Sequence, residues 1–181
     1  MRAESRRIDD ASSLLEGIRA SIPDDALWAP YLADLQEDPC HTRAVHLGIF
    51  NQPYLDSLLG GKKTVESRFS SVRCAPYRSV RPGDVVLVKR SSGPIVALFR
   101  AGDVWSHRLT SKAWGMIRER FAEGLCAAGP GFWQENESAA YATLIEVEHL
   151  RHLVPIPWNK SDRRGWVVLR RRRNPNPTLF E

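Results

Sequence analysis

The segment Gly60-Gly61-Lys62-Lys63-Thr64-Val65-Glu66-Ser67-Arg68 places a glycine turn directly before a run in which charged residues alternate with apolar or small ones. Successive side chains of a β-strand point to opposite faces, so Glu66 and Arg68 share one charged face. Val65 and Phe69 lie on the other face, which suits a hydrophobic core. The segment therefore predicts a strand with one polar and one apolar side.

The charged face of this strand has more than one interpretation. A carboxylate beside a guanidinium, with lysines at the strand entrance, suits a cleft that binds a polar, anionic ligand. The alternatives are a solvated strand edge and an internal ion pair between Glu66 and Arg68 that fixes the strand entrance. The sequence alone leaves the three open.

Length and cysteine usage restrict the class of protein. A chain of 181 residues is long enough for one well-buried domain with an appendage. No apolar run approaches the length of a membrane span, so we expect a cytoplasmic protein with no membrane partner. The three cysteines are widely spaced and unpaired, and the five histidines lack metal-ligand spacing. We expect free thiols, no metal and no cofactor, and the oligomeric state stays unknown.

The charge is distributed unevenly along the chain. Residues 1–41 contain four arginines and nine acidic residues, a net charge of −5, whereas residues 42–181 contain 22 basic and 12 acidic residues, a net charge of +10. Most of the basic residues are arginines, which suit bidentate phosphate and base-edge contacts. The main part of the chain is therefore predicted to bind a polyanion, RNA or DNA, with a charged solubilising surface as the alternative.

The hydrophobic pattern predicts three parts. Residues 1–41 form an acidic helical extension, because apolar residues recur at helical spacing over 9–20 and again over 27–35. Residues 42–170 form the main domain, and residues 171–181 form a basic, proline-containing tail. Strands are expected at 45–50, 64–69, 85–88, 95–99 or 95–105, 141–150 and 166–169, with helices at 54–59 and about 111–125.

This order of elements predicts an α+β fold. No stretch has the sustained βαβ periodicity of a doubly wound parallel sheet. A small curved, barrel-like sheet with helices at its edges fits the pattern better. The turn Arg81-Pro82-Gly83-Asp84 supports the strand that follows it, because proline and glycine occupy the central positions of a type II turn.

The motif Gly61-x-Lys63-x-x-Glu66-x-Arg68, directly after Gln52-Pro53-Tyr54 and a short helix, resembles the signature of ASCH domains, which belong to the PUA-like superfamily. The resemblance covers residues 45–170 in organisation, although only this motif is specific. It implies a small β-barrel with flanking helices and a cleft lined by the motif. PUA-like relatives bind RNA or modified DNA, and some hold a single base, so recognition of a single or modified base is an expectation.

The candidate contacts follow from side-chain chemistry. Lys63 and Arg68 can neutralise phosphates, and Glu66 can orient Arg68 or accept a hydrogen bond from a base. Amides at the strand-to-helix junction can contact a base or cap the helix, and Tyr54 is expected in the core. Aromatic and basic residues alternate again near 158–166, as in nucleic-acid surfaces, where a tryptophan either stacks on a base or closes the barrel end. The predicted nucleic-acid contacts are Asn51, Gln52, Lys62, Lys63, Glu66, Arg68, Arg73, Lys89, Arg90, Trp158, Lys160, Arg163 and Arg164.

A hydrolase is the alternative function. Some ASCH-like proteins resemble amidohydrolases that act on acylated cytidine with a lysine and a threonine three positions later, and others are linked to single-stranded RNA cleavage. Here Glu66 stands where that threonine is expected, which lowers the amidohydrolase interpretation, although Thr64 remains as a rearranged nucleophile. If the protein is an enzyme, the catalytic candidates are Lys63 and Glu66.

Overall fold

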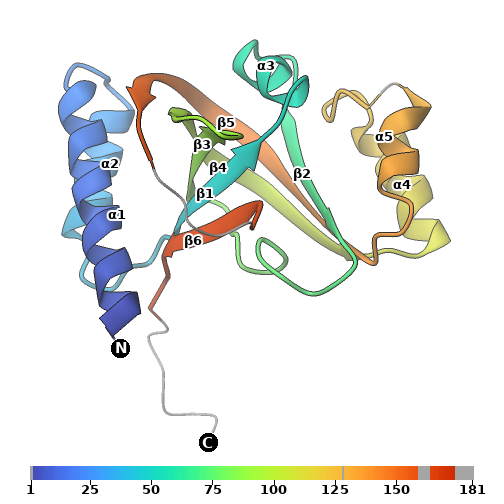
Figure 1. The fold of residues 1–181 in the computed structure, drawn as a ribbon, viewed down its shortest axis with the longest axis horizontal. Coiled ribbons are helices and arrows are strands. Elements are labelled where there is room, and N and C mark those ends of the chain that lie inside the picture. Colours follow the sequence, from blue (N-terminus) through green and yellow to red (C-terminus); the bar gives the residue numbers. More distant parts are fainter. Residues whose placement is uncertain (1, 128, 159–163, 174–181) are drawn as a thin grey trace, which may run out of the picture.

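The computed structural model describes residues 2–127, 129–158 and 164–173, which form one mixed α+β unit (Figure 1). The chain runs through α1 (Arg2–Ser21), α2 (Trp28–Glu37), β1 (Val45–Phe50), α3 (Tyr54–Leu59), β2 (Val65–Ser70), β3 (Val85–Arg90), β4 (Ile95–Arg108), α4 (Ser111–Phe121), α5 (Pro130–Glu135), β5 (Tyr141–Ile156) and β6 (Trp166–Arg170). None of the helices in these residues is long and apolar enough to cross a membrane.

The six strands form one curled sheet in the order β2-β5-β4-β3-β1-β6. Neighbouring strands are antiparallel except for β1 and β3, which run parallel with Val45 opposite Val85. The sheet curls into a half-barrel, so the expected small barrel-like sheet with flanking helices is confirmed. β2 and β6 are its two edges, and no strand pairing joins them within the described residues.

Several predicted elements differ in extent from the structure. β4 and β5 extend to Arg108 and Ile156, beyond the expected strands at 95–99 or 95–105 and at 141–150, because they pair with each other along most of their length with irregular register. From the sequence, Pro30 is expected to bend or shorten the second helix, but it lies in the first turn of α2, where a proline removes no helical hydrogen bond. The long helical pattern ends before Gly129, as the Gly129-Pro130-Gly131 segment predicts, and a helix not expected from the sequence, α5, begins there with Gly129 as N-cap.

The sheet buries apolar side chains on both faces, as its alternating pattern requires. On β3, Val85 and Leu87 face the cluster beneath α1 and α2, whereas Val86 and Val88 face the cluster beneath α3. A third cluster lies at the other end of the sheet, where α4 packs through Ile117 on β2 and β5. Figure 1 shows the two helix pairs, α1 with α2 and α4 with α5, on opposite sides of the molecule.

The two N-terminal helices share a core with the main domain. Leu15 and Ile18 of α1 and Leu32 of α2 are fully buried in the same cluster as Val45 and Leu47 of β1. Their burial on the sheet means that the acidic helices of residues 1–41 contribute to the apolar core of the half-barrel.

The turn before β3 has the predicted geometry and carries a buried polar centre. Gly83 has φ +85°, the left-handed conformation that a type II turn requires at this position. Asp84 is fully buried and accepts hydrogen bonds from the backbone N–H groups of Ala44 and Arg81 and from the Arg172 guanidinium. Asp84 thereby joins the turn, the start of β1 and the end of the described chain.

Leu15→Ala is expected to lower the free energy of unfolding by about 3 kcal/mol, because the substitution opens a cavity between α1 and the sheet. Urea titrations followed by circular dichroism and by tryptophan fluorescence should shift together to lower urea. Gly17→Ala on the exposed face of α1 is the control, since an added methyl group meets nothing within 4 Å. Two separate transitions in the Leu15 variant would mean that α1 folds independently of the sheet.

Candidate functional site

The start of β2 is set by a tight reversal after α3. Gly60 ends the helix, Gly61 has φ +71°, and the backbone N–H groups of Lys62 and Lys63 both donate to the carbonyl of Ser57 at 2.9 Å. A side chain at Gly61 would be strained at this φ, so the glycine permits the reversal. The chain then enters β2 with Glu66 and Arg68 on the same face, as strand alternation predicts.

Lys63, Glu66 and Arg68 form a contiguous group of charges. Nζ of Lys63 lies 3.4 Å from Oε2 of Glu66, and Nε of Arg68 lies 2.8 Å from Oε1. Nζ of Lys63 also donates to the carbonyl of Val65 at 2.8 Å. Nε of Arg68 and Oε1 of Glu66 are close enough to form an ion pair, but the N–H group is not aligned for a hydrogen bond. One carboxylate is thus held between two cations.

Burial excludes a solvated strand edge for this part of β2. The side chains of Lys63 and Glu66 are only 3% and 4% exposed, whereas Arg68 is 20% exposed. Removing each of these charges from water costs several kcal/mol, which only close pairing offsets. The internal ion pair is therefore real, and it lies in the wall of a cavity.

Arg68 connects the two edges of the half-barrel. Its NH1 group donates to the carbonyl of Gly165, directly before β6, at 3.1 Å. The guanidinium lies 4.8 Å from the ring centre of Phe50 and 5.1 Å from that of Trp166, within the range of cation–π attraction. These contacts hold the guanidinium in one orientation across the gap between the edge strands β2 and β6. We call this gap the seam.

The first cavity lies beside these charges and has a volume of about 270 Å³. Its walls come from the end of β1, from α3, from β2 and from α5. Aromatic, amide and charged side chains face the same space. The lining residues are Ile49, Phe50, Asn51, Tyr54, Lys63, Glu66, Ser67, Arg68, Phe69, Phe132, Glu135 and Asn136.

Tyr54 lines this cavity rather than entering the core, which corrects the expectation from its helical spacing. It is half-buried and packs edge-on against Phe132 of α5, with ring centres 5.8 Å apart. Burial raises the pKa of the Tyr54 hydroxyl, and the Glu135 carboxylate and the Cys126 thiol raise it further. The phenol therefore stays protonated at neutral pH and is available as a hydrogen-bond donor.

Sequence reasoning missed the contribution of α5. Phe132, Glu135 and Asn136 line the first cavity, although more than 60 residues separate them from the motif on β2. A Gly-Pro pair before an aromatic-containing stretch is a recognisable helix start. That signal predicts the helix, but not the cavity that the helix closes.

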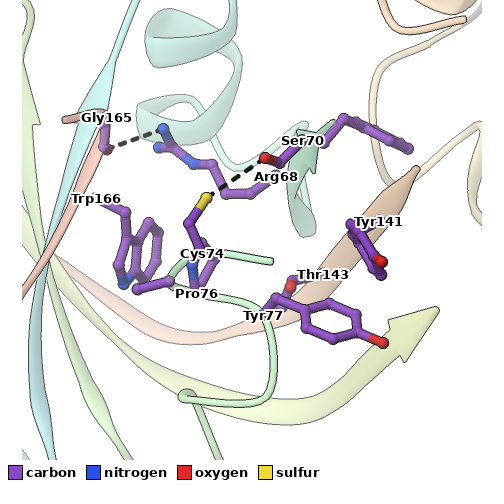
Figure 2. Close-up of a pocket in the computed structure, with 11 residues that line it drawn as sticks. Arg68, Ser70, Cys74, Pro76, Tyr77, Tyr141, Thr143, Gly165 and Trp166 are labelled. Carbon is purple, nitrogen blue, oxygen red and sulfur yellow. Dashed lines mark hydrogen bonds between the residues drawn. The ribbon is translucent and has the colours of Figure 1, made fainter. Parts of the chain in front are cut away.

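A second cavity of about 190 Å³ lies further along β2 (Figure 2). Trp166 and Pro76 stand on one side of it, and Tyr77 and Tyr141 on the other, with Arg68 across the top. The Cys74 thiol lies 3.4 Å from the Ser70 hydroxyl. The lining residues are Arg68, Phe69, Ser70, Cys74, Ala75, Pro76, Tyr77, Tyr141, Thr143, Gly165 and Trp166.

A fully buried histidine, His46, supports the Trp166 wall of the second cavity. Nδ1 of His46 accepts a hydrogen bond from Nε1 of Trp166 at 3.1 Å, so Nε2 carries the ring proton and donates to Asp84, also at 3.1 Å. This chain of bonds fixes the Trp166 ring on which Arg68 lies. His46 acts as a positioning residue here.

The remaining predicted contacts are dispersed over the fold. Asn51 lines the first cavity, whereas the Gln52 amide donates to Asp56 within the α3 turn. Lys62 is exposed next to the motif, and the Arg73 guanidinium lies 5.5 Å from the Tyr141 ring centre. Among the described residues, Arg90 and Arg164 are exposed and line neither cavity. Lys160 and Arg163 lie outside the described residues.

Two predicted contacts, Lys89 and Trp158, lie away from both cavities. Lys89 is 6% exposed and donates to the carbonyl of Gly93, which holds the turn between β3 and β4. Trp158 packs against the apolar cluster beneath α1 and α2 and lines neither cavity. Their contacts lie outside the Lys63–Glu66–Arg68 group, and a nucleic-acid contact at either residue stays a prediction.

The cysteines and histidines form no metal centre in the part of the chain described. All three cysteines are free, with Cys40 and Cys74 exposed and Cys126 half-buried. No group of three or more histidine, cysteine, aspartate or glutamate residues is placed to hold an ion in residues 2–127, 129–158 and 164–173.

The fold is that of ASCH domain proteins. A crystal structure of ASCH from Zymomonas mobilis aligns with a TM-score of 0.56 and 14% sequence identity, over 71% of this chain and 89% of that chain. Two variants of the same protein, with a tyrosine changed to phenylalanine and a serine changed to alanine, also align with a TM-score of 0.56, at 14% and 12% identity, over 71% of this chain and 91% and 90% of theirs. No protein-family model and no curated protein sequence matches the chain.

These comparisons concern the half-barrel and the helices around it. At such low identity the likeness concerns the fold, which agrees with the resemblance carried by the β2 motif. The function must be argued from the residues of the two cavities, because one fold hosts unrelated activities.

Glu66→Gln is expected to lower the free energy of unfolding by about 3 kcal/mol, because it leaves the buried Lys63 ammonium without its carboxylate. Urea denaturation at neutral pH measures the change. Glu148→Gln is the matched control, since it breaks a Glu–Arg pair whose side chains are 35% and 32% exposed, and exposed pairs contribute less than about 1 kcal/mol. Equal losses in both variants would contradict the buried-pair interpretation.

Proposed function

We propose that this protein binds single-stranded nucleic acid and holds one base in the first cavity, beside Lys63, Glu66 and Arg68. One observation carries the proposal: a cavity with aromatic walls contains a buried, fully paired carboxylate together with amide side chains and cations. Aromatic rings stack on bases, and paired polar groups read base edges.

The side chains of the first cavity suit the parts of a nucleotide. Tyr54 and Phe132 supply aromatic surfaces for the base. Each oxygen of Glu66 contacts one cation and retains a lone pair, so the carboxylate can accept a hydrogen bond from an exocyclic amine. Asn51 and Asn136 add amide donors and acceptors. A preference for a modified base stays a prediction.

The charge of the main domain favours a polyanionic partner. Residues 42–181 carry a net charge of +10, and Lys62 is an exposed cation next to the cavity motif. Phosphate contacts of this kind supply affinity without sequence preference and weaken with added salt. The choice between RNA and DNA depends on groups that recognise the 2′-hydroxyl, so the binding test compares both.

A hydrolase that acts on single-stranded RNA or on an acylated cytidine is the second candidate. The observation in its favour is the buried Lys63–Glu66 pair in a cavity that also presents the protonated Tyr54 hydroxyl, since such groups serve as general acids and bases. Thr64 does not line the cavity, so it gains no support as a nucleophile.

Lys62→Ala is expected to weaken the binding of a single-stranded oligonucleotide and to reduce the salt slope by about 0.7 for the one phosphate contact removed. Fluorescence anisotropy with labelled eight-nucleotide RNA and DNA, from low to moderate salt, measures both quantities. Lys112→Ala is the matched control, because Lys112 is equally charged and exposed at the start of α4 and lines neither cavity. Equal effects of the two substitutions would mean that binding involves net charge alone.

Binding and hydrolysis are separated with the same ligands. We expect the oligonucleotides to be recovered intact after incubation, as measured by denaturing electrophoresis, and acylated cytidine to be recovered intact by chromatography. Cleavage that is lost in Glu66→Gln, checked to be folded by circular dichroism, would instead support the hydrolase. The absence of binding to either oligonucleotide at moderate salt would contradict the proposed function.

A further inference from the structure

The two cavities meet at the seam. Arg68 and Phe69 line both of them, and the remaining walls follow β2 from the α3 side to the loop that contains Cys74 and Pro76. β2 and β6 are the edge strands of the half-barrel, and Arg68 reaches from one to the carbonyl before the other. The cavities are therefore neighbouring compartments on either side of one guanidinium.

The second cavity has the chemistry of a base-stacking site in its own right. Tyr77 and Tyr141 pack edge-on with ring centres 5.0 Å apart. The Arg73 guanidinium lies 5.5 Å from the Tyr141 ring centre, and the Arg78 guanidinium lies 5.5 Å from that of Tyr77. Both arginines are exposed. Aromatic rings flanked by exposed cations are typical of surfaces that stack bases and follow a phosphate backbone.

Each cavity has a volume that suits one unit of a polymeric ligand. At about 270 and 190 Å³, both are smaller than the roughly 300 Å³ at which cavities for a whole drug-sized ligand begin. A ligand that fills both must pass Arg68. The group that passes should be an anion, because the guanidinium is held in place by Glu66 and Gly165 and still has further N–H donors.

We propose that the seam binds two consecutive nucleotides of a single strand, with one base in each cavity and the linking phosphate on Arg68. This inference rests on the proposed function and extends it, because it assigns the second cavity and makes a dinucleotide the smallest complete ligand. Phe50 and Trp166 hold the Arg68 guanidinium in position before the ligand arrives, which reduces the ordering cost of binding.

The first test compares nucleoside 5′-monophosphates with the four dinucleoside monophosphates ApA, CpC, GpG and UpU by calorimetry. We expect the best dinucleotide to bind at least about tenfold more tightly than the best mononucleotide, because a second stacked base adds affinity. A dinucleoside monophosphate carries less negative charge than a nucleoside 5′-monophosphate, so tighter binding of the dinucleotide cannot come from added charge. Equal affinities would overturn the two-nucleotide proposal and leave the single-base function standing.

Cys74→Phe tests the second cavity directly, because the larger side chain fills it from an exposed loop position. We expect this variant to lose the dinucleotide gain of about tenfold while its affinity for mononucleotides stays unchanged. Cys74→Ser is the control that leaves the cavity open. With an eight-nucleotide strand as ligand, unchanged affinity in Cys74→Phe would also overturn the proposal.

The thiols provide a further measurement on the unaltered chain. Cys74 lines the second cavity and Cys40 lies outside both cavities, and both are exposed. A saturating dinucleotide should slow the alkylation of Cys74 but not that of Cys40, as followed by peptide mass spectrometry. A saturating mononucleotide should protect neither. Alkylation of Cys74 at the same rate with and without a bound dinucleotide would contradict the proposal, whereas the failure of every single strand to bind would contradict the proposed function itself.

Discussion

The contact between Glu66 and Arg68 is the interaction on which the organisation of this protein depends. Among the described strands, β2 and β6 are the two edges of the curled sheet, and Arg68 spans the gap between them while Glu66 holds its Nε from within the same strand. Edge strands must be covered or blocked to avoid non-specific pairing. Here the cover is a side chain with its own ion pair, which leaves a cavity on either side of it.

The site is built on rigid elements with a buried supporting shell. Trp166 lies beneath Arg68 and is held by His46, which is held in turn by Asp84. Asp84 also accepts the hydrogen bonds that close the turn before β3. Such a shell fixes the first-contact residues more precisely than a loop could. The hydrogen bonds that satisfy these buried polar groups therefore also fix the orientation of the Trp166 ring in the cavity wall.

Local sequence rules predicted much of this arrangement. Glycine at a left-handed position and proline before it specify the turn at 81–84, and period-two alternation places Glu66 and Arg68 together. The same local spacing failed for Tyr54, because helical periodicity identifies a buried face without identifying what that face contacts. Local spacing also does not show that Trp158 packs on the cluster beneath α1 and α2, because that cluster is formed by residues distant in the chain.

The sequence by itself determined that β2 has one charged and one apolar face, that a glycine reversal precedes it, and that a basic α+β domain surrounds it. Only the tertiary structure decided that the charged face points inward, where Lys63 and Glu66 are almost completely buried. It also decided that α5 supplies Phe132 and that the 74–77 loop closes a second cavity. The physical reason is that these contacts depend on how the sheet curls and which edges meet, and both follow from long-range packing rather than from the local alternation of side chains.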